Sequence, residues 1–110
     1  ATIALVTHTG AKTGTVRTTP LVCNLDGGDV IIIASKAGAP THPHWYLNLI
    51  ANPTATVELG TDKFEASVTE ATGAERDRLY AAQAAIMPQF NDYVVGAGDR
   101  VIPVLRLTRK

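Results

Sequence analysis

The stretch VRTTPLVCNLDGGDVIIIAS, residues 16–35, decides the fold. It contains two β-rich segments, residues 16–24 and 30–35, separated by the turn-forming sequence DGGD at residues 26–29. A short glycine-containing turn between such segments predicts an antiparallel hairpin. Pro20 lacks the N–H that a strand ladder needs, so it predicts an edge strand or a bulge in the first segment. The second segment is apolar on both faces, which indicates a central, buried strand.

A helix is expected over residues 44–51. Pro43 suits its first turn, because proline already has a helical φ and the first helical N–H needs no partner. The sequence Asn-Pro at residues 52–53 ends the helix. The side chains expected to face the core are Trp45, Leu47, Leu49 and Ile50.

A second helix is expected to begin after Thr72 and to end near Ile86. Thr72 and Glu75 have the spacing of a capping box, in which each side chain bonds a backbone N–H at the helix start. Leu79, Ala82 and Ile86 would form its buried face. Pro88 closes this helix, and residues 89–95 follow as a short aromatic-bearing segment.

Hairpins dominate the predicted order of elements. Besides the first hairpin, strands are expected at residues 2–7, 54–59, 63–70 and 101–107. The resulting order β-β-β-α-β-β-α-β predicts a mainly antiparallel α+β fold, closed or half-closed into a barrel.

Composition limits the size and the class of the protein. The chain has 110 residues, 45% of them hydrophobic, and ten Lys and Arg balance ten Asp and Glu. It is long enough for one domain, residues 1–110, and its zero net charge argues against a nucleic-acid binder. Cys23 is the only cysteine, which excludes an internal disulfide, and no apolar run is long enough for a transmembrane helix. The chain starts at Ala1 in a strand-like segment, so we expect a natural N-terminal extension to be missing.

The loop after the first strand is rich in glycine and threonine and is basic. It contains Lys12, with Arg17 beside it, and residues 1–25 contain no carboxylate. Backbone N–H groups, hydroxyls and two cations can together bind a phosphate. The alternative is an ordinary solvated hairpin loop, and the glycine spacing is not that of a Walker A motif.

Three further segments carry candidate functional residues. The buried strand ends in Ser35 and Lys36, followed by tiny residues that would let a flat ring approach, although an ordinary connecting loop also fits. His42 and His44 are too few ligands for a metal site, and none is expected. Three large side chains, spaced three residues apart, could line an apolar pocket or belong to the core: Met87, Phe90 and Tyr93.

No nucleophile or acid–base pair is convincingly arranged, so a bound cofactor is expected to supply the reactive group. Three motifs in order support this expectation: G-x-K-[ST]-G-x-x-R at residues 10–17, A-S-K-x-G-A at 34–39 and P-x-W-Y-x-N-L-x-A-N-P at 43–53. Together they resemble the deazaflavin-dependent nitroreductase and F420H2-dependent quinone reductase family of actinobacteria.

The resemblance implies a split β-barrel and coenzyme F420, an 8-hydroxy-5-deazaflavin, with FMN as the alternative. It implies that Ala11, Lys12, Thr13 and Arg17 hold the phosphate and the acidic tail of the coenzyme. The ribityl chain and the ring would contact two sets of residues: Thr18, Thr19, Pro20, Leu21 and Val22, and Ile33, Ala34, Ser35 and Lys36. The site would be completed by His44, Trp45, Tyr46, Leu47, Asn48 and Phe90.

The resemblance also implies the reaction. A reduced deazaflavin would pass a hydride to a quinone, or to an activated enone or lactone such as a coumarin or aflatoxin. Ser35 and Tyr93 would be catalytic, and Ser35, Met87, Phe90 and Tyr93 would contact the acceptor. Met87 and Phe90 lack the hydroxyl expected at their positions, which weakens the expectation of nitroimidazole reduction. A non-catalytic deazaflavin carrier is a further alternative.

The expected partners are small molecules rather than nucleic acid. Either a monomer or a homodimer is compatible with the sequence. The expected location is the cytoplasm. Peripheral attachment to the inner face of the membrane is an alternative.

Overall fold

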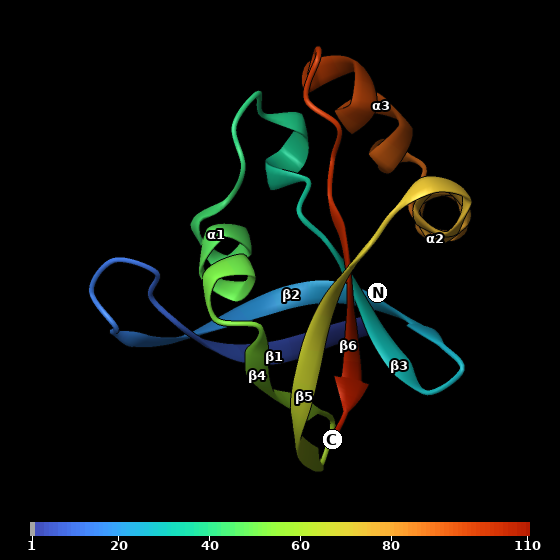
Figure 1. Ribbon diagram of the computed structural model, residues 1–110. Helices are drawn as coiled ribbons and strands as arrows, with labels where there is room; N and C mark the ends of the chain where they lie inside the picture. Colours follow the sequence, from blue (N-terminus) through green and yellow to red (C-terminus); the bar gives the residue numbers. More distant parts are fainter. Residues whose placement is uncertain (1) are drawn as a thin grey trace.

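Six antiparallel strands form a closed barrel in the computed structural model, which describes residues 2–110 (Figure 1). The order around the barrel is β1-β2-β3-β6-β5-β4, and β4 pairs with β1 to close it. The strands are β1 (Thr2–Thr9), β2 (Val16–Asp26), β3 (Asp29–Ile33), β4 (Thr54–Leu59), β5 (Asp62–Ala71) and β6 (Val104–Arg109).

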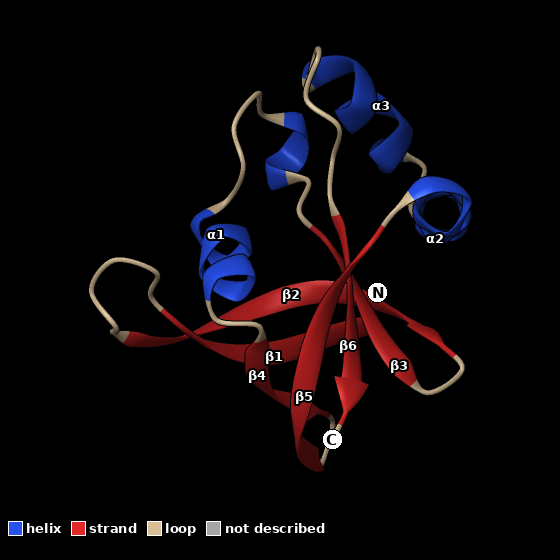
Figure 2. Ribbon diagram, in the orientation of Figure 1, coloured by secondary structure: helices blue, strands red, loops and turns tan. Residues whose placement is uncertain are grey.

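The helices gather at one end of the barrel, as Figure 2 shows. A one-turn 3-10 helix, η1 (Lys36–Gly38), follows β3, and α1 (His44–Ala51) lies across the end of the barrel. After β5 come α2 (Gly73–Ile86) and α3 (Gln89–Gly96). The fold is the expected α+β split β-barrel, but residues 2–110 form three α-helices where two were expected.

Two hydrophobic cores share the wall formed by β3 and β6. Because side chains of a strand alternate between its faces, Val30 and Ile32 point into the barrel while Ile31 points outward. The barrel interior also receives Leu49, which is fully buried and anchors α1. Outside the wall, α2 and α3 form the second core around Tyr80.

One stretch of the barrel wall is an open edge. Along residues 16–22, β2 pairs only with β1, because its ladder with β3 covers only Cys23–Asp26. Pro20 lies within this edge, opposite Leu5, which confirms the edge position predicted for it. The wall therefore splits beside the first half of β2, beyond the point where β3 ends.

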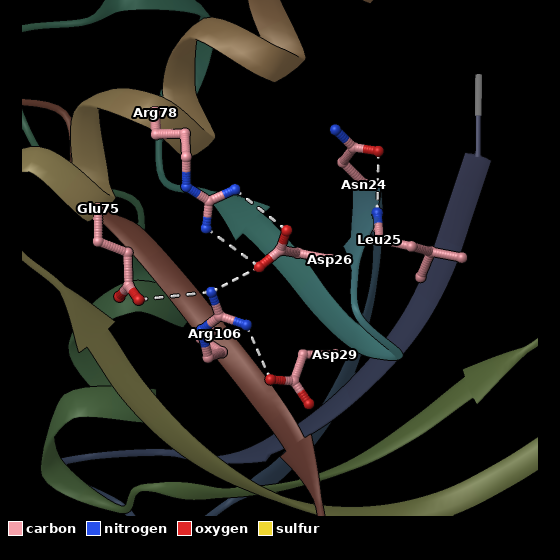
Figure 3. A network of polar contacts seen from close by, with 7 residues as sticks. All are labelled: Asn24, Leu25, Asp26, Asp29, Glu75, Arg78 and Arg106. Atoms are coloured by element: carbon pink, nitrogen blue, oxygen red, sulfur yellow. Dashed lines mark hydrogen bonds and ion pairs between the residues drawn. The ribbon is translucent and has the colours of Figure 1, made fainter.

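A cluster of ion pairs connects the β2–β3 hairpin to β6 and α2 (Figure 3). Arg106 on β6 donates to Asp26 and Asp29, each at 2.8 Å, on either side of the hairpin turn. Arg78 on α2 pairs with Asp26 at 3.1 Å. Hydrogen bonds from Arg78 and Arg106 lower the pKa of Asp26 to about 2.

Four sequence expectations about the elements are wrong in detail. β6 begins at Val104 rather than at residue 101, since Ile102 packs into the second core and Pro103 cannot donate to a ladder. Strand β3 ends at Ile33, two residues earlier than expected. Residues 89–96 are a full helix. Thr72 is the N-cap of α2 without a side-chain bond, and Glu75 instead lies 3.5 Å from Arg106.

The expected buried faces of the two helices also need correction. In α1 only Leu49 is buried, whereas Leu47 and Ile50 are exposed, because the helix meets the barrel along a narrow stripe. In α2, Ile86 is exposed and Ala82 is half-buried. The face that packs is Leu79, Tyr80, Gln83 and Ala84.

Candidate functional site

A cavity of about 610 Å³ lies between the β1–β2 hairpin and α1. It continues the inner face of the barrel beyond the point where the wall splits. In the β1–β2 ladder, His8 and Thr19 lie on the same face as the side chains that point into the barrel. It is called the groove below. Its lining residues are His8, Gly10, Ala11, Lys12, Thr13, Arg17, Thr19, His44, Trp45, Leu47 and Asn48.

The loop at the groove's rim is held by its own backbone. Gly10 N–H donates to the Thr15 carbonyl at 2.8 Å, and Gly14 N–H donates to the Gly10 carbonyl at 3.1 Å. The Thr13 hydroxyl donates to that of Thr15 at 2.9 Å. Gly14 has a φ of 70°, a left-handed conformation that glycine adopts without strain. These bonds give the loop a defined structure, and its residues 11–17 are exposed.

The groove is electropositive. Lys12 and Arg17 both line it, and neither makes an ion pair within residues 2–110. No carboxylate lines the groove. Two unpaired cations beside threonine hydroxyls form a set of donors that suits a phosphate or a carboxylate ligand.

A chain of hydrogen bonds joins the loop to α1 through the buried His8. Ala11 N–H donates to Asn48 Oδ1 at 2.9 Å, which leaves Asn48 Nδ2 facing His8 Nδ1 at 3.1 Å. Because Nδ2 is a donor, His8 Nδ1 must accept and Nε2 carries the proton, which it gives to Thr19 Oγ1 at 2.9 Å. Burial, and secondly the charge of Arg17, lower the pKa of His8, which agrees with this neutral form.

The segment that carries Ser35 lies at the end of β3, beside α3. Ser35 is half-buried, and its hydroxyl makes no hydrogen bond to the rest of residues 2–110, so it is free to donate to a ligand. Lys36 Nζ donates to Thr41 Oγ1 at 3.0 Å. The backbone then makes a left-handed turn through Lys36 and Ala37 to Gly38.

The three large residues predicted near the acceptor lie between the end of α2 and the middle of α3. Phe90 is buried in the second core, its ring 6.1 Å from that of Tyr80 and 5.0 Å from that of Tyr93. Met87 and Tyr93 are half-buried against the same core. None of the three lines the groove. Because Phe90 is buried, only Met87 and Tyr93 among them have a surface that a ligand could reach.

The structure brings together only part of the predicted site. Nine of the predicted site residues line the groove, around the loop and α1, but strand alternation turns Thr18, Pro20 and Val22 to the opposite face of β2. Thr18 there shares a hydrogen bond with Thr7 at 2.8 Å. Residues lying elsewhere are Leu21, packed on the barrel core; Ile33, against the second core; Ala34, buried; and Tyr46, beside a separate cavity.

That separate cavity, of about 360 Å³, lies on the other side of α1. Tyr46 borders it and donates to Glu70 Oε1 at 2.9 Å; burial, and then Glu70, raise the pKa of Tyr46 to about 12. Arg76 gives two hydrogen bonds to the Ile102 carbonyl in its wall. Tyr46, Glu70 and Arg76 in its wall are thus already hydrogen-bonded within the protein.

Two site residues carried no usable signal in the sequence. The sequence assigns no role to His8, although His8 joins β2 and α1 through its hydrogen bonds to Thr19 and Asn48. Arg100, which binds the segment around Ser35, lies 65 residues from it in sequence. Across residues 2–110, no three His, Cys, Asp or Glu side chains meet as metal ligands, and no helix is long and apolar enough to cross a membrane.

Comparison with known proteins identifies the family of the chain. Residues 1–109 match the F420H(2)-dependent quinone reductase family. The chain belongs to this family. An F420H(2)-dependent quinone reductase of Mycobacterium tuberculosis is 36% identical over 110 residues, covering 97% of this chain and 74% of that protein. The chain is therefore an oxidoreductase whose cofactor is coenzyme F420.

Solved structures support the same assignment. An F420-H2 dependent reductase, FDR-A, has a TM-score of 0.86 and 37% identity over 96% of this chain and 92% of that one. A chain described as a domain-swapped dimer has a TM-score of 0.87 and 37% identity, covering 96% of this chain and 78% of that one. HutZ, a heme storage protein from Vibrio cholerae, shares only the fold, with 10% identity, a TM-score of 0.71, and coverage of 99% and 82%.

The groove of this F420H2-dependent quinone reductase family member fits its cofactor. Coenzyme F420 carries a phosphate and an acidic tail, and the groove offers Lys12 and Arg17 without a competing carboxylate. The fit rests on two observations: Lys12 and Arg17 make no ion pair within residues 2–110, and hydrogen bonds define the loop that carries Lys12.

Proposed function

We propose that the groove binds the phosphate and acidic tail of coenzyme F420, and that Ser35 and Tyr93 act where the deazaflavin ring meets an electron-poor acceptor. The observation that carries this proposal is the pair of unpaired cations, Lys12 and Arg17, in a groove without carboxylates. When bound and reduced, the coenzyme supplies a hydride, and the acceptor we propose is a quinone or an activated enone.

The chain's own residues would bind, orient and protonate. Lys12 and Arg17 would make charge-assisted hydrogen bonds to the anionic part of the coenzyme, which are stronger than neutral ones. The defined loop and α1 would hold the coenzyme in a fixed direction along the groove. The free Ser35 hydroxyl could then donate to the acceptor as negative charge develops on it.

Binding is tested by titrating the protein with coenzyme F420 and following its fluorescence. We expect Lys12→Gln and Arg17→Gln each to raise the Kd roughly tenfold at low salt, with a smaller effect at high salt. Lys63→Gln is the matched control, since Lys63 is exposed on β5 and outside the groove. Unchanged affinity in both groove variants would place the anion site elsewhere.

Turnover is tested by mixing the protein with reduced coenzyme F420 and menadione and following reoxidation of the coenzyme. We expect Ser35→Ala to lower kcat more than it weakens coenzyme binding. Equal losses would make Ser35 a packing residue. Tight binding of FMN without binding of coenzyme F420 would refute the proposal, and binding without turnover over a panel of quinones and enones would indicate a carrier.

A further inference from the structure

Arg100 makes an unusual set of contacts, all directed at one short segment of the chain. Its guanidinium donates to the carbonyls of Ala34 at 2.9 Å, Ser35 at 2.7 Å and Ala39 at 2.9 Å. A fourth bond, at 3.0 Å, goes to His42 Nδ1. Four bonds from one side chain to residues 34–42 make Arg100 the main polar support of the segment that carries Ser35.

Arg100 has no acidic partner. Its side chain makes no ion pair within residues 2–110, and it is half-buried. Partly buried arginines usually satisfy their charge with a carboxylate, so a guanidinium paired only with carbonyls and an imidazole serves geometry rather than charge balance. Its planar fork matches several acceptors at fixed angles, which a lysine ammonium cannot do.

The supported segment is strained. Lys36 and Ala37 have φ values of 48° and 52°, in the left-handed region that residues with a Cβ rarely adopt, and Gly38 follows at 79°. Such conformations persist only where surrounding contacts hold them, and they concentrate at functional sites. The Arg100 bonds reach carbonyls on both sides of this turn, directly before Lys36 and directly after Gly38.

The same turn lies in backbone contact with α3 (Figure 1). A Cβ added to Gly38 would stand 2.8 Å from the Tyr93 Cα, and one added to Gly96 would stand 2.9 Å from the Gly38 carbonyl oxygen. No side chain fits between the two elements. The position of the turn therefore also sets the position of Tyr93 relative to Ser35.

We propose that Arg100 is a positioning residue of the reductase, which fixes the Ser35 turn against α3 so that Ser35 and Tyr93 keep a productive arrangement. It acts through the backbone and does not line the groove. The inference rests on the proposed function, because that function gives Ser35 and Tyr93 their roles. It predicts that Arg100 matters for turnover more than for binding of the coenzyme's anionic part.

The experiment compares Arg100→Lys and Arg100→Met with the wild type. Both are expected to lower kcat about tenfold to hundredfold, since small displacements of reacting groups cost that much, while the Kd for coenzyme F420 changes less than about threefold. Arg78→Lys is the matched control, because Arg78 is exposed and pairs with Asp26 far from this segment. It should retain wild-type kcat.

A double-mutant cycle separates positioning from general stability. If Arg100 acts through Ser35, the double variant S35A/R100K should lose little more kcat than Ser35→Ala alone. Fully additive losses, or parallel changes in kcat and Kd, would overturn the inference. A wild type that does not oxidise reduced coenzyme F420 would instead refute the proposed function.

Hydrogen exchange gives a readout that does not depend on the coenzyme. Gly38 N–H donates to the Ser35 carbonyl at 2.9 Å and Ala39 N–H donates to the Lys36 carbonyl at 3.1 Å, so both amides should exchange slowly in the wild type. In Arg100→Lys they should exchange at least about tenfold faster, while amides of the barrel strands stay unchanged. Unchanged exchange at Gly38 and Ala39 would overturn the inference even in an inactive protein.

Discussion

Replacing Asn48 by alanine removes the link between the groove loop and α1. Asn48 gives one hydrogen bond to His8 and accepts one from Ala11. His8 is only 3% exposed, so its Nδ1 would lose a partner that water cannot easily replace, at a cost of about 1–3 kcal/mol. Ala11 is exposed, and water restores most of its bond. Alanine's better helix propensity returns roughly 0.5 kcal/mol, so we expect a net loss of about 1.5 kcal/mol.

Urea denaturation at pH 7.5 measures this loss as a shift of the unfolding midpoint at constant slope. Asn91→Ala is the matched control, because Asn91 lies exposed on α3 and its side chain makes no hydrogen bond within residues 2–110. It should change the free energy of unfolding by less than about 0.5 kcal/mol. If Asn48→Ala is no less stable than Asn91→Ala, the link does not contribute and the reasoning is refuted.

The pH dependence of stability gives the same prediction a second readout. Burial lowers the pKa of folded His8 below 6.5, so between the folded pKa and 6.5 the unfolded chain binds more protons. The free energy of unfolding should therefore be constant above about pH 7 and fall as the pH drops below 6.5. In Asn48→Ala this fall should be smaller, since protonated Nδ1 no longer meets a donor. An identical acid-side fall in both proteins would contradict the assigned tautomer.

Two further substitutions test the barrel and the ion-pair cluster. Leu49→Ala should cost about 3 kcal/mol of unfolding free energy, because Leu49 is fully buried and anchors α1, whereas the neighbouring exposed Ile50→Ala should cost little in the same urea titration. Asp26→Asn should be less stable than the wild type above pH 4, and this difference should shrink as the pH falls from 4 towards the Asp26 pKa of about 2. Asp92→Asn is the control for removing a carboxylate. A difference in stability that does not depend on pH would contradict the ion pairs.

Local patterns were enough to predict most of the barrel. The turn at residues 26–29 between two β-rich segments identified the β2–β3 hairpin, and Pro20 indicated the edge. The predicted bounds of the elements were wrong where tertiary contacts override local preference. Residues 101–103 are apolar like a strand, but Ile102 is drawn into the second core and Pro103 cannot complete a ladder.

The site was predictable where its residues are neighbours in sequence. Lys12 lies in the loop between β1 and β2 and Arg17 follows it at the start of β2, so their charge without nearby carboxylates was visible directly. The links from His8 to Asn48 and from Arg100 to Ser35 join residues 40 and 65 positions apart, and no local pattern reports such pairs. Strand alternation further shows that side chains at 18–22 cannot all face one ligand.

The open edge of β2 has a consequence for behaviour in a crowded solution. A strand whose backbone is unpaired along one side is a template on which another chain can add a strand, and edges of this kind promote aggregation. Pro20 interrupts the row of donors in the middle of residues 16–22, and Arg17 places a charge near its start. The proline thus leaves the edge open to a small ligand while making it a poor match for a foreign polypeptide strand.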